Sequence, residues 1–468
     1  MNIFILGAGQ VGSSIATFLD PDPTINVTVI DNDARSIDLL NGRNLDLKTV
    51  LGNASHPSVL QDAGVEDAEI VLAVTGSDEA NIVACQICYE VFSTPMRIAR
   101  IRSDQYQRYD LFSKDNPAFA IDEVINPEGA VTQQFYQLIK NQGASEILQF
   151  CEGVVEVVTF RTTPESILFG KTIGWLKNRI EMLYANIVGV RKSNDRYPSF
   201  YSDLSQDTTL QVDDEIYVVC DTRVARSMFL ALNYQLNATS KVVIAGGGHI
   251  GEGLAIKLRD ESTFNQITVI ERDPARCQYL EKSLSNCVVI QGDATDKNLL
   301  ESNYVDKANI YCAITDDDEV NIMSSLLAKQ IGVSHVLSLI KKQDYLDIVA
   351  NTAIDVPISP QQSTASAIFR HVREVSPDVI QGINDNLSQV MEITVKAGQR
   401  EDIIGGNLYA IPLPVTVQLI AIRKGQEIIL GDALANVIFE EWDRLLFFIS
   451  NVNDVAKVES LFRLNPVV

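Results

Sequence analysis

The stretch Ile5-Leu6-Gly7-Ala8-Gly9-Gln10-Val11-Gly12 decides the fold class, because it places the spacing G-x-G-x-x-G between an apolar run and a helical pattern. In such a strand–turn–helix unit the first glycine allows the tight turn, and the second lets a pyrophosphate approach the backbone. The third lets the helix pack against the sheet. Free N–H groups at the start of the helix then face the phosphates. The alternative is that these glycines serve only the turn.

An acidic residue follows at the distance that a dinucleotide fingerprint requires. Asp31 lies 19 residues after Gly12 (31 − 12), at the end of the second expected strand. A carboxylate at this position accepts hydrogen bonds from an adenosine ribose and repels a 2′-phosphate. The sequence therefore favours NAD over NADP.

The whole pattern occurs a second time, 239 or 240 residues later. Ile244-Ala245-Gly246-Gly247-Gly248-His249-Ile250-Gly251 repeats the glycine stretch at an offset of 239 (246 − 7), and Glu271 repeats Asp31 at 240 (271 − 31). Two further landmarks recur at 240: Gly52-Asn53-Ala54-Ser55 as Gly292-Asp293-Ala294-Thr295, and Asp78-Glu79-Ala80-Asn81-Ile82 as Asp318-Glu319-Val320-Asn321-Ile322. Four landmarks in one order predict two copies of one unit.

Each copy is expected to contain two domains of different type. In copy one, short β-rich runs alternate with helix-length segments at residues 2–6, 26–30, 48–51, 70–74 and 97–101, which predicts a parallel sheet. After each such region, short strands are separated by Gly, Pro and Asp turns. We therefore predict an α/β fold class with two Rossmann-like domains at 1–140 and 237–375. Small α+β domains are expected at 141–236 and 376–468.

The composition excludes several classes of protein. The chain has 468 residues, of which 46% are apolar and 21% charged, as in soluble globular proteins. Its formal net charge is −23, so neither nucleic acid nor an anionic membrane surface is expected as a direct partner. No apolar run approaches the roughly 18 residues of a membrane span, and the N-terminus lacks a signal-peptide pattern. Seven scattered cysteines fit a reducing cytosol.

Strand ends add residues to the two expected sites. Ligands of open parallel sheets bind outside the carboxyl ends of the strands, so Val74 and Thr75 should face the nucleotide, as should Ile314 and Thr315 in copy two. The acidic run Asp316–Glu319 opens the next helix, where negative charge is favourable, and cation binding is the alternative.

The two sites are expected to differ at one arginine. Arg100 lies on the next strand of copy one, where its forked donors can clamp a diphosphate. Aligning Tyr106 with Tyr345 places Leu339 at the position of Arg100. The second site should therefore bind more weakly or prefer another nucleotide.

No catalytic or metal-ligating arrangement is apparent. Cys85 and Cys88 form a C-x-x-C pair, but no second pair follows at metal spacing, and packing in a helix explains them. His249 lies within the second glycine loop, where ligand contact and simple loop filling are equally compatible with the sequence. No proton-transfer residue accompanies the first site, so the sequence predicts cofactor sites without chemistry.

These features together resemble the TrkA family, the cytosolic NAD-binding regulatory subunits of bacterial Trk potassium-uptake systems, which are built from two RCK (regulator of potassium conductance) units. Besides the first glycine stretch, the resemblance rests on Asp78-Glu79-x-Asn81, Arg97-Ile98-Ala99-Arg100-Ile101-Arg102, Glu271-Arg272-Asp273 and Ile358-Ser359-Pro360-Gln361-Gln362. It covers nearly the whole chain. The nucleotide-binding residues that the motifs and the resemblance indicate are Gly7, Ala8, Gly9, Gln10, Val11, Gly12, Asp31, Val74, Thr75 and Arg100 in copy one. In copy two they are Gly246, Gly247, Gly248, His249, Ile250, Gly251, Glu271, Ile314 and Thr315.

The resemblance implies a function without catalysis. It implies NAD or NADH as ligand, with ATP or ADP at the same sites, and a potassium channel or transporter subunit of TrkH or TrkG type as the integral-membrane partner. It also implies self-association into a dimer or ring. The protein would lie in the cytoplasm at the inner face of the membrane and touch the membrane only through that partner. An NAD-linked oxidoreductase with tandem Rossmann domains and a regulator of potassium efflux are the alternatives.

Overall fold

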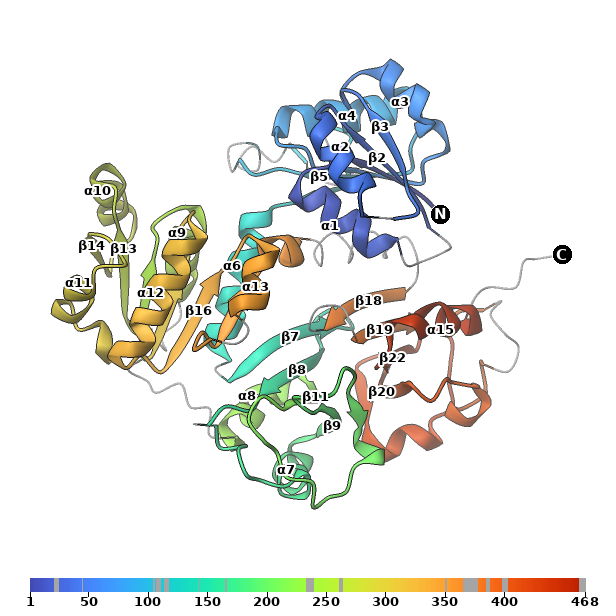
Figure 1. Ribbon diagram of the computed structural model, residues 1–468. Coiled ribbons are helices and arrows are strands. Elements are labelled where there is room, and N and C mark those ends of the chain that lie inside the picture. The colour runs from blue at the N-terminus through green and yellow to red at the C-terminus, as the bar shows by residue number, and fades with distance from the viewer. Residues whose placement is uncertain are drawn as a thin grey trace. The chain divides into compact units, whose positions relative to one another are not determined.

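The computed structural model describes residues 1–20, 25–43, 45–103, 106, 111–112, 118–141, 143–164, 166–232, 240–260, 264–349, 352–364, 378–383, 388–397 and 403–462. These residues form two compact units (Figure 1). One unit joins Met1–Phe135 to Lys241–Val372, and the other joins Tyr136–Ser240 to Arg373–Val468. Among the described residues, no helix is long and apolar enough to span a bilayer.

The first unit contains a six-stranded sheet from copy one of the repeat. Its strands are β1 (Asn2–Leu6), β2 (Asn26–Asp31), β3 (Lys48–Leu51), β4 (Ile70–Ala73), β5 (Met96–Arg100) and β6 (Glu123–Ile125). They pair in parallel in the order β3-β2-β1-β4-β5-β6, which is the Rossmann order. The connecting helices are α1 (Gln10–Leu19), α2 (Ala34–Asn41), α3 (Pro57–Ala63) and α4 (Asp78–Glu90), and α6 (Pro127–Lys140) follows the last strand.

The second six-stranded sheet repeats this arrangement in copy two. Its strands are β12 (Ser240–Ala245), β13 (Phe264–Glu271), β14 (Cys287–Gln291), β15 (Ile310–Ala313), β16 (His335–Leu339) and β17 (Val356–Ile358), in the order β14-β13-β12-β15-β16-β17. Its helices are α9 (His249–Arg259), α10 (Pro274–Ser283), α11 (Lys297–Ser302), α12 (Asp318–Ile331) and α13 (Gln343–Val349). The α/β fold class and the internal repeat predicted from the sequence are confirmed.

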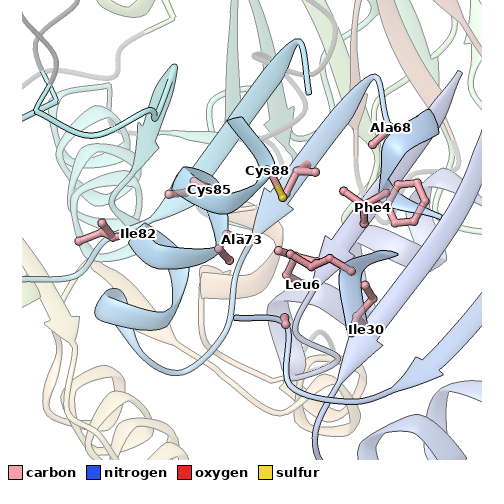
Figure 2. Packing of buried hydrophobic residues seen from close by; sticks show 14 of the residues in the cluster. Phe4, Leu6, Ile30, Ala68, Ala73, Ile82, Cys85 and Cys88 are labelled. Carbon is pink, nitrogen blue, oxygen red and sulfur yellow. The ribbon is translucent and has the colours of Figure 1, made fainter. Parts of the chain in front are cut away.

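The central strands of the parallel sheets, among them β1, β4 and β15, are buried along nearly their whole length, which is why they are almost continuously apolar. Along β1, Ile3 and Ile5 join one hydrophobic cluster, whereas Phe4 and Leu6 join the cluster on the other face. Figure 2 shows the second cluster, where Cys85 and Cys88 from α4 pack beside Phe4 and Leu6. Burial raises the pKa of the Cys88 thiol to about 12, so this residue packs as a neutral side chain.

The second unit contains two antiparallel five-stranded sheets. In the first, β7 (Ala144–Phe150), β8 (Val155–Arg161), β9 (Ala185–Arg191), β10 (Ser199–Phe200) and β11 (Glu215–Asp221) lie in the order β10-β9-β11-β8-β7, with helices α7 (Ile173–Ile180) and α8 (Thr222–Ala231). In the second, β18 (Asp378–Ile383), β19 (Ser388–Thr394), β20 (Val417–Lys424), β21 (Glu427–Leu430) and β22 (Arg444–Ile449) lie in the order β18-β19-β22-β20-β21, followed by α15 (Val455–Phe462).

The two antiparallel sheets share one hydrophobic core. The ring of Phe448 from β22 lies 5.2 Å from the ring of Tyr217 and 6.2 Å from that of Phe200, measured between centroids. Polar contacts supplement this core, because the Cys151 amide donates to Glu392 at 2.7 Å and Arg444 forms an ion pair with Glu152 at 2.5 Å. The side chains of both sheets are thus interlocked in the second unit.

Candidate nucleotide-binding site

The first glycine loop has the geometry that its sequence predicts. Gly7 follows β1 with φ +116°, and a Cβ there would lie 3.0 Å from the backbone of Thr75. A Cβ at Gly12 would lie 1.8 Å from the carbonyl oxygen of Gly7, so α1 packs where only glycine fits. Gly9 differs from both, because no atom of the described residues lies within 4 Å of a Cβ at that position. The loop is therefore tight at its two ends and open at Gly9, where α1 begins without a side-chain cap.

Asp31 is held against this loop by backbone N–H groups. Its carboxylate accepts from the amide of Ala8 at 2.5 Å and from the amide of Asp33 at 2.8 Å. These bonds fix the carboxylate at the carboxyl end of β2, beside the opening of the loop. Ala8 itself is buried, so its contribution is the N–H group rather than its side chain.

A fully buried asparagine, Asn81, joins the next two strand ends; the sequence indicated it as a landmark of the repeat and as part of the family motif, but not as a residue of the site. The side-chain oxygen of Asn81 accepts from the amide of Thr75 at 2.9 Å and from its hydroxyl at 2.7 Å. Its side-chain nitrogen donates to the carbonyl oxygen of Arg100 at 2.9 Å. Asn81 therefore aligns β4 with β5. The signal for this role was its recurrence at Asn321.

Arg100 projects into a cavity of about 560 Å³ at this edge of the sheet. Its Nε atom is buried and has no hydrogen-bond partner among the described residues. Burial lowers the pKa of Arg100, and the neighbouring charge of Arg102 lowers it further. A buried donor on a cationic side chain is costly unless an anion binds it.

Most of the predicted residues of copy one line this cavity. They are Gly7, Gly9, Gln10, Val11, Asp31, Val74, Thr75 and Arg100. Ala8 and Gly12 support the loop from behind. The sequence did not indicate the remaining described lining residues, which are Ile30, Asn32, Ser36, Asn53, Ala54, Ser55, Gly76, Ser77 and Ala80. Of these, the segment 53–55 was visible only as a repeated landmark, since nothing local in it indicates a ligand.

Copy two reproduces the framework of the site. Gly246 has φ +109°, and the carboxylate of Glu271 accepts from the Gly247 amide at 2.8 Å and from the Asp273 amide at 2.8 Å. Asn321 bonds to the amide of Thr315, which follows Ile314, at 2.8 Å and to the carbonyl oxygen of Leu339 at 3.0 Å.

The start of α9 is exposed in this loop. Gly248 precedes the helix as its N-cap residue, and His249 and Ile250 are its first two residues. His249 is exposed to solvent, whereas Gly251 is buried, with a Cβ position 2.0 Å from the carbonyl oxygen of Gly246. The structure therefore places Gly251 in the packing role and leaves His249 at the open end of the loop.

The two copies differ in which charged groups surround the loop. In copy two, Arg276 donates to the carbonyl oxygen of Gly247 at 2.6 Å and to the carboxylate of Glu252 at 2.6 Å. The repeat offsets place Ser36 and Ser13 at these two positions of copy one. Leu339, at the position of Arg100, is buried and apolar. The second loop therefore has an ion pair beside it that copy one lacks, and the adjoining strand carries a leucine where copy one has Arg100.

The acidic side chains at the start of α12 already bind other groups of the protein. Asp317 caps the helix, and Asp318 accepts from the amides of Lys341 and Lys342 at 2.9 and 2.8 Å. Asp316 pairs with the Lys341 ammonium at 3.1 Å. Among the residues that the structure describes, no group of three or more acidic, histidine or cysteine side chains is arranged to hold a metal.

Two sheets of Rossmann order, each with a glycine loop and an acidic residue at the end of its second strand, define a tandem Rossmann-type protein. Comparison with known proteins gives the family. The model of the TrkA-N domain matches residues 3–127 and 242–360, which is more than half of the chain. The chain therefore belongs to the TrkA family.

A relative agrees with this assignment, and two solved structures share the fold. The "Trk system potassium uptake protein TrkA" of Halomonas elongata is 35% identical over 466 residues, which cover 99% of each chain. The crystal structure of the GsuK RCK domain has a TM-score of 0.60 at 17% identity, covering 98% of this chain and 94% of that one. The GsuK channel bound to NAD has a TM-score of 0.58 at 17% identity, covering 98% of this chain and 78% of that one. The two structures support the fold.

Proposed function

We propose that this protein is a nucleotide-binding regulatory subunit of a potassium-uptake system. In this proposal NAD or NADH binds the first glycine loop, and ATP or ADP competes for the same place. Asp31 holds the adenosine ribose, the loop around Gly9 accepts the phosphates, and Arg100 pairs with them. The loop Gly246–Gly251 with Glu271 forms a second site of lower affinity.

The observation that carries this proposal is Arg100, whose buried Nε has no hydrogen-bond partner among the described residues. Arg100 lines a cavity that also exposes Gly9 and the start of α1, where anions are favoured. A diphosphate bridging the helix start and the guanidinium would satisfy both. Forked donors of arginine suit phosphate oxygens, and hydrogen bonds to charged groups contribute about 1.5–3 kcal/mol each.

The lining of this cavity supports a signalling role over an enzymatic one. Hydride transfer from a substrate requires a group that takes or gives a proton beside the nicotinamide. Among the described lining residues there is no histidine, lysine, tyrosine or cysteine. We therefore assign the nucleotide the role of a ligand that shifts a conformational equilibrium, by as much as its affinities for the two conformations differ.

The potassium-uptake role rests on the family. The Halomonas relative is named for potassium uptake, and its match extends over 99% of this chain. A net charge of −23 suits docking on a basic face of an integral-membrane potassium channel or transporter subunit, at the cytoplasmic side. Self-association into a dimer or closed ring would then transmit the nucleotide-dependent change to the pore.

Gly9 offers a variant that tests this function without disturbing the fold. A Cβ at Gly9 meets nothing within 4 Å, so Gly9→Asp places a carboxylate at the phosphate position, and Gly9→Ala is the neutral control. Cells that depend on this protein should lose nucleotide-responsive potassium uptake with Gly9→Asp and retain it with Gly9→Ala. Equal uptake in both variants would contradict the proposal. The proposal would also be contradicted if the protein oxidised NADH in the presence of a substrate from a test panel and Gly9→Asp abolished this activity.

A further inference from the structure

A second cavity, of about 890 Å³, lies between the two antiparallel sheets of the second unit. None of its lining residues belongs to either glycine loop. Its volume falls within the range of about 300–1,000 Å³ that small-molecule sites occupy. Its walls are aliphatic, and both sheets contribute to them through Ile187, Val188 and Val219 on one side and Leu419, Ile420 and Ile428 on the other.

The packing of the two sheets holds these walls in place. Val188, Val219 and Ile420 belong to the same hydrophobic cluster as Tyr217 and Phe448. The residue after β21, Gly431, has φ +65°, and a Cβ there would lie 3.0 Å from the side-chain oxygen of Asn186. The second small domain thus approaches β9 as closely as glycine allows, and the cavity exists before any ligand enters.

Several hydrogen-bond acceptors line this cavity. The side-chain oxygen of Gln418 is buried and has no partner within the described part of the chain. The carboxylates of Glu181, Glu427 and Asp432 also line the cavity, and they form no ion pair with any other described residue. A ligand that satisfies this set must bring N–H or O–H donors, and positive charge suits the carboxylates.

The lining carries more acidic than cationic side chains. Arg223 forms an ion pair with Asp221 at 2.5 Å, and the ammonium of Lys177 lies 5.3 Å from the centroid of the Tyr201 ring. Against these two cations stand the carboxylates of Glu181, Asp221, Glu427 and Asp432, so the charge of the described lining favours a cation over an anion. The lining also includes Tyr184, whose side chain is 78% exposed and whose φ of 53° is rare for a bulky residue. Its ring provides a face that a cation can approach.

We propose that this cavity binds an amphipathic organic cation, with its apolar body between the two sheets and its ammonium group at Gln418 and the acidic rim. The acidic rim consists of Glu181, Glu427 and Asp432. Because the ligand would contact both small domains, its binding would stabilise their packed arrangement. The residues of this site do not belong to the glycine loops, so the inference does not require that a nucleotide binds there.

The test compares two probes of the same shape and opposite charge on the full-length protein. Tryptamine carries an ammonium group on an indole body, and indole-3-propionate carries a carboxylate on the same body. Calorimetric titration should give one saturable tryptamine site per chain and no heat of binding for indole-3-propionate. Gln418→Leu, which removes the buried acceptor at similar volume, should weaken tryptamine binding.

A charge-matched pair of variants separates the rim from the overall charge of the protein. Neutralising the rim with Glu181→Gln, Glu427→Gln and Asp432→Asn should weaken tryptamine binding about tenfold. The control neutralises three exposed acids of the same unit outside the cavity, with Asp195→Asn, Asp207→Asn and Glu441→Gln, and should leave binding unchanged. The proposal is overturned if tryptamine does not bind up to about 10 mM. Equal binding of indole-3-propionate, or equal loss in both triple variants, overturns it as well.

Discussion

The side-chain nitrogen of Asn81 donates to the carbonyl oxygen of Arg100 at 2.9 Å, and Asn321 makes the same bond to Leu339 at 3.0 Å. The two copies therefore keep one backbone frame at the carboxyl ends of their central strands. What changes is the side chain that the frame presents to the ligand. Copy one presents an arginine whose Nε has no hydrogen-bond partner among the described residues, and copy two presents an aliphatic group. The asymmetry of the two sites arises from this exchange.

The first prediction concerns Arg100. Replacing it by leucine, the residue of copy two, should lower nucleotide affinity at the first site about 10- to 100-fold, because a charge-assisted contact to phosphate is lost. The fold should be retained, since Leu339 occupies the same frame. Calorimetric titration with NADH measures the effect. Arg35→Leu, which removes an exposed arginine outside the cavity, is the control and should bind as the parent protein does.

Asp31 should set the preference between the two dinucleotides. Asp31→Ala removes the ribose acceptor and the charge that repels a 2′-phosphate, so the ratio of the NADP to the NAD dissociation constant should fall. Asp31→Asn keeps an acceptor for the Ala8 amide and isolates the contribution of charge. Dissociation constants for NAD and NADP in the three proteins give the ratio. If the ratio is unchanged in Asp31→Ala, the carboxylate of Asp31 does not contact the ribose.

The ion pair of the second loop predicts opposite effects for a single and a double variant. Arg276→Ser should weaken nucleotide binding at the second site, because the carboxylate of Glu252 is left beside the phosphate position. Combining it with Glu252→Ser recreates the residues of copy one and should raise affinity several-fold above that of the parent. Measurements in a Gly9→Asp background, in which the first site is expected to be abolished, report the second site alone. Weaker binding in the double variant would mean that Arg276 itself holds the phosphate.

Buried Asn81 should matter for stability as well as for binding. Asn81→Ala leaves the Thr75 amide and the Arg100 carbonyl without partners in a buried region, which costs about 2–4 kcal/mol of unfolding free energy. Chemical denaturation should show a lower midpoint for the first parallel domain. Asn53→Ala is the control for loss of an asparagine near the same cavity, because among the described residues its side chain bonds only to Ser55, two positions further along the chain. Equal midpoints for Asn81→Ala and the parent would refute this role.

The pH dependence of stability should have a contribution from His335. Burial lowers the pKa of this histidine on β16, although Asp355 nearby acts in the opposite direction. The unfolded chain therefore takes up a proton at a higher pH than the folded chain does. Stability should fall as the pH decreases below about 6.5, the pKa of an unperturbed histidine. In His335→Gln the denaturation midpoint should change less between pH 7 and pH 5.5 than it does in the parent protein. An unchanged dependence of the midpoint on pH would exclude His335 as the cause.

Local sequence signals predicted the framework of the site, and long-range contacts determined the rest. The glycine loops, Asp31 and the end of β4 were predictable because strand, turn and helix follow one another along the chain. The role of Asn81 was not, since its bond to Arg100 spans two strands. Arg276 was missed because its partner Glu252 lies on another helix. The cavity of the second unit depends on the packing of Phe448 against Tyr217, which no local pattern encodes.

The most direct test of the proposed function is calorimetric titration of the full-length protein with NAD, NADH, ATP and ADP, beside Gly9→Asp and Gly9→Ala. We predict a tighter and a weaker binding event, with the tighter one abolished in Gly9→Asp and retained in Gly9→Ala. Absence of nucleotide binding to the parent protein, or a tighter event that survives Gly9→Asp, would contradict the assignment of the first glycine loop and Arg100 as the regulatory site.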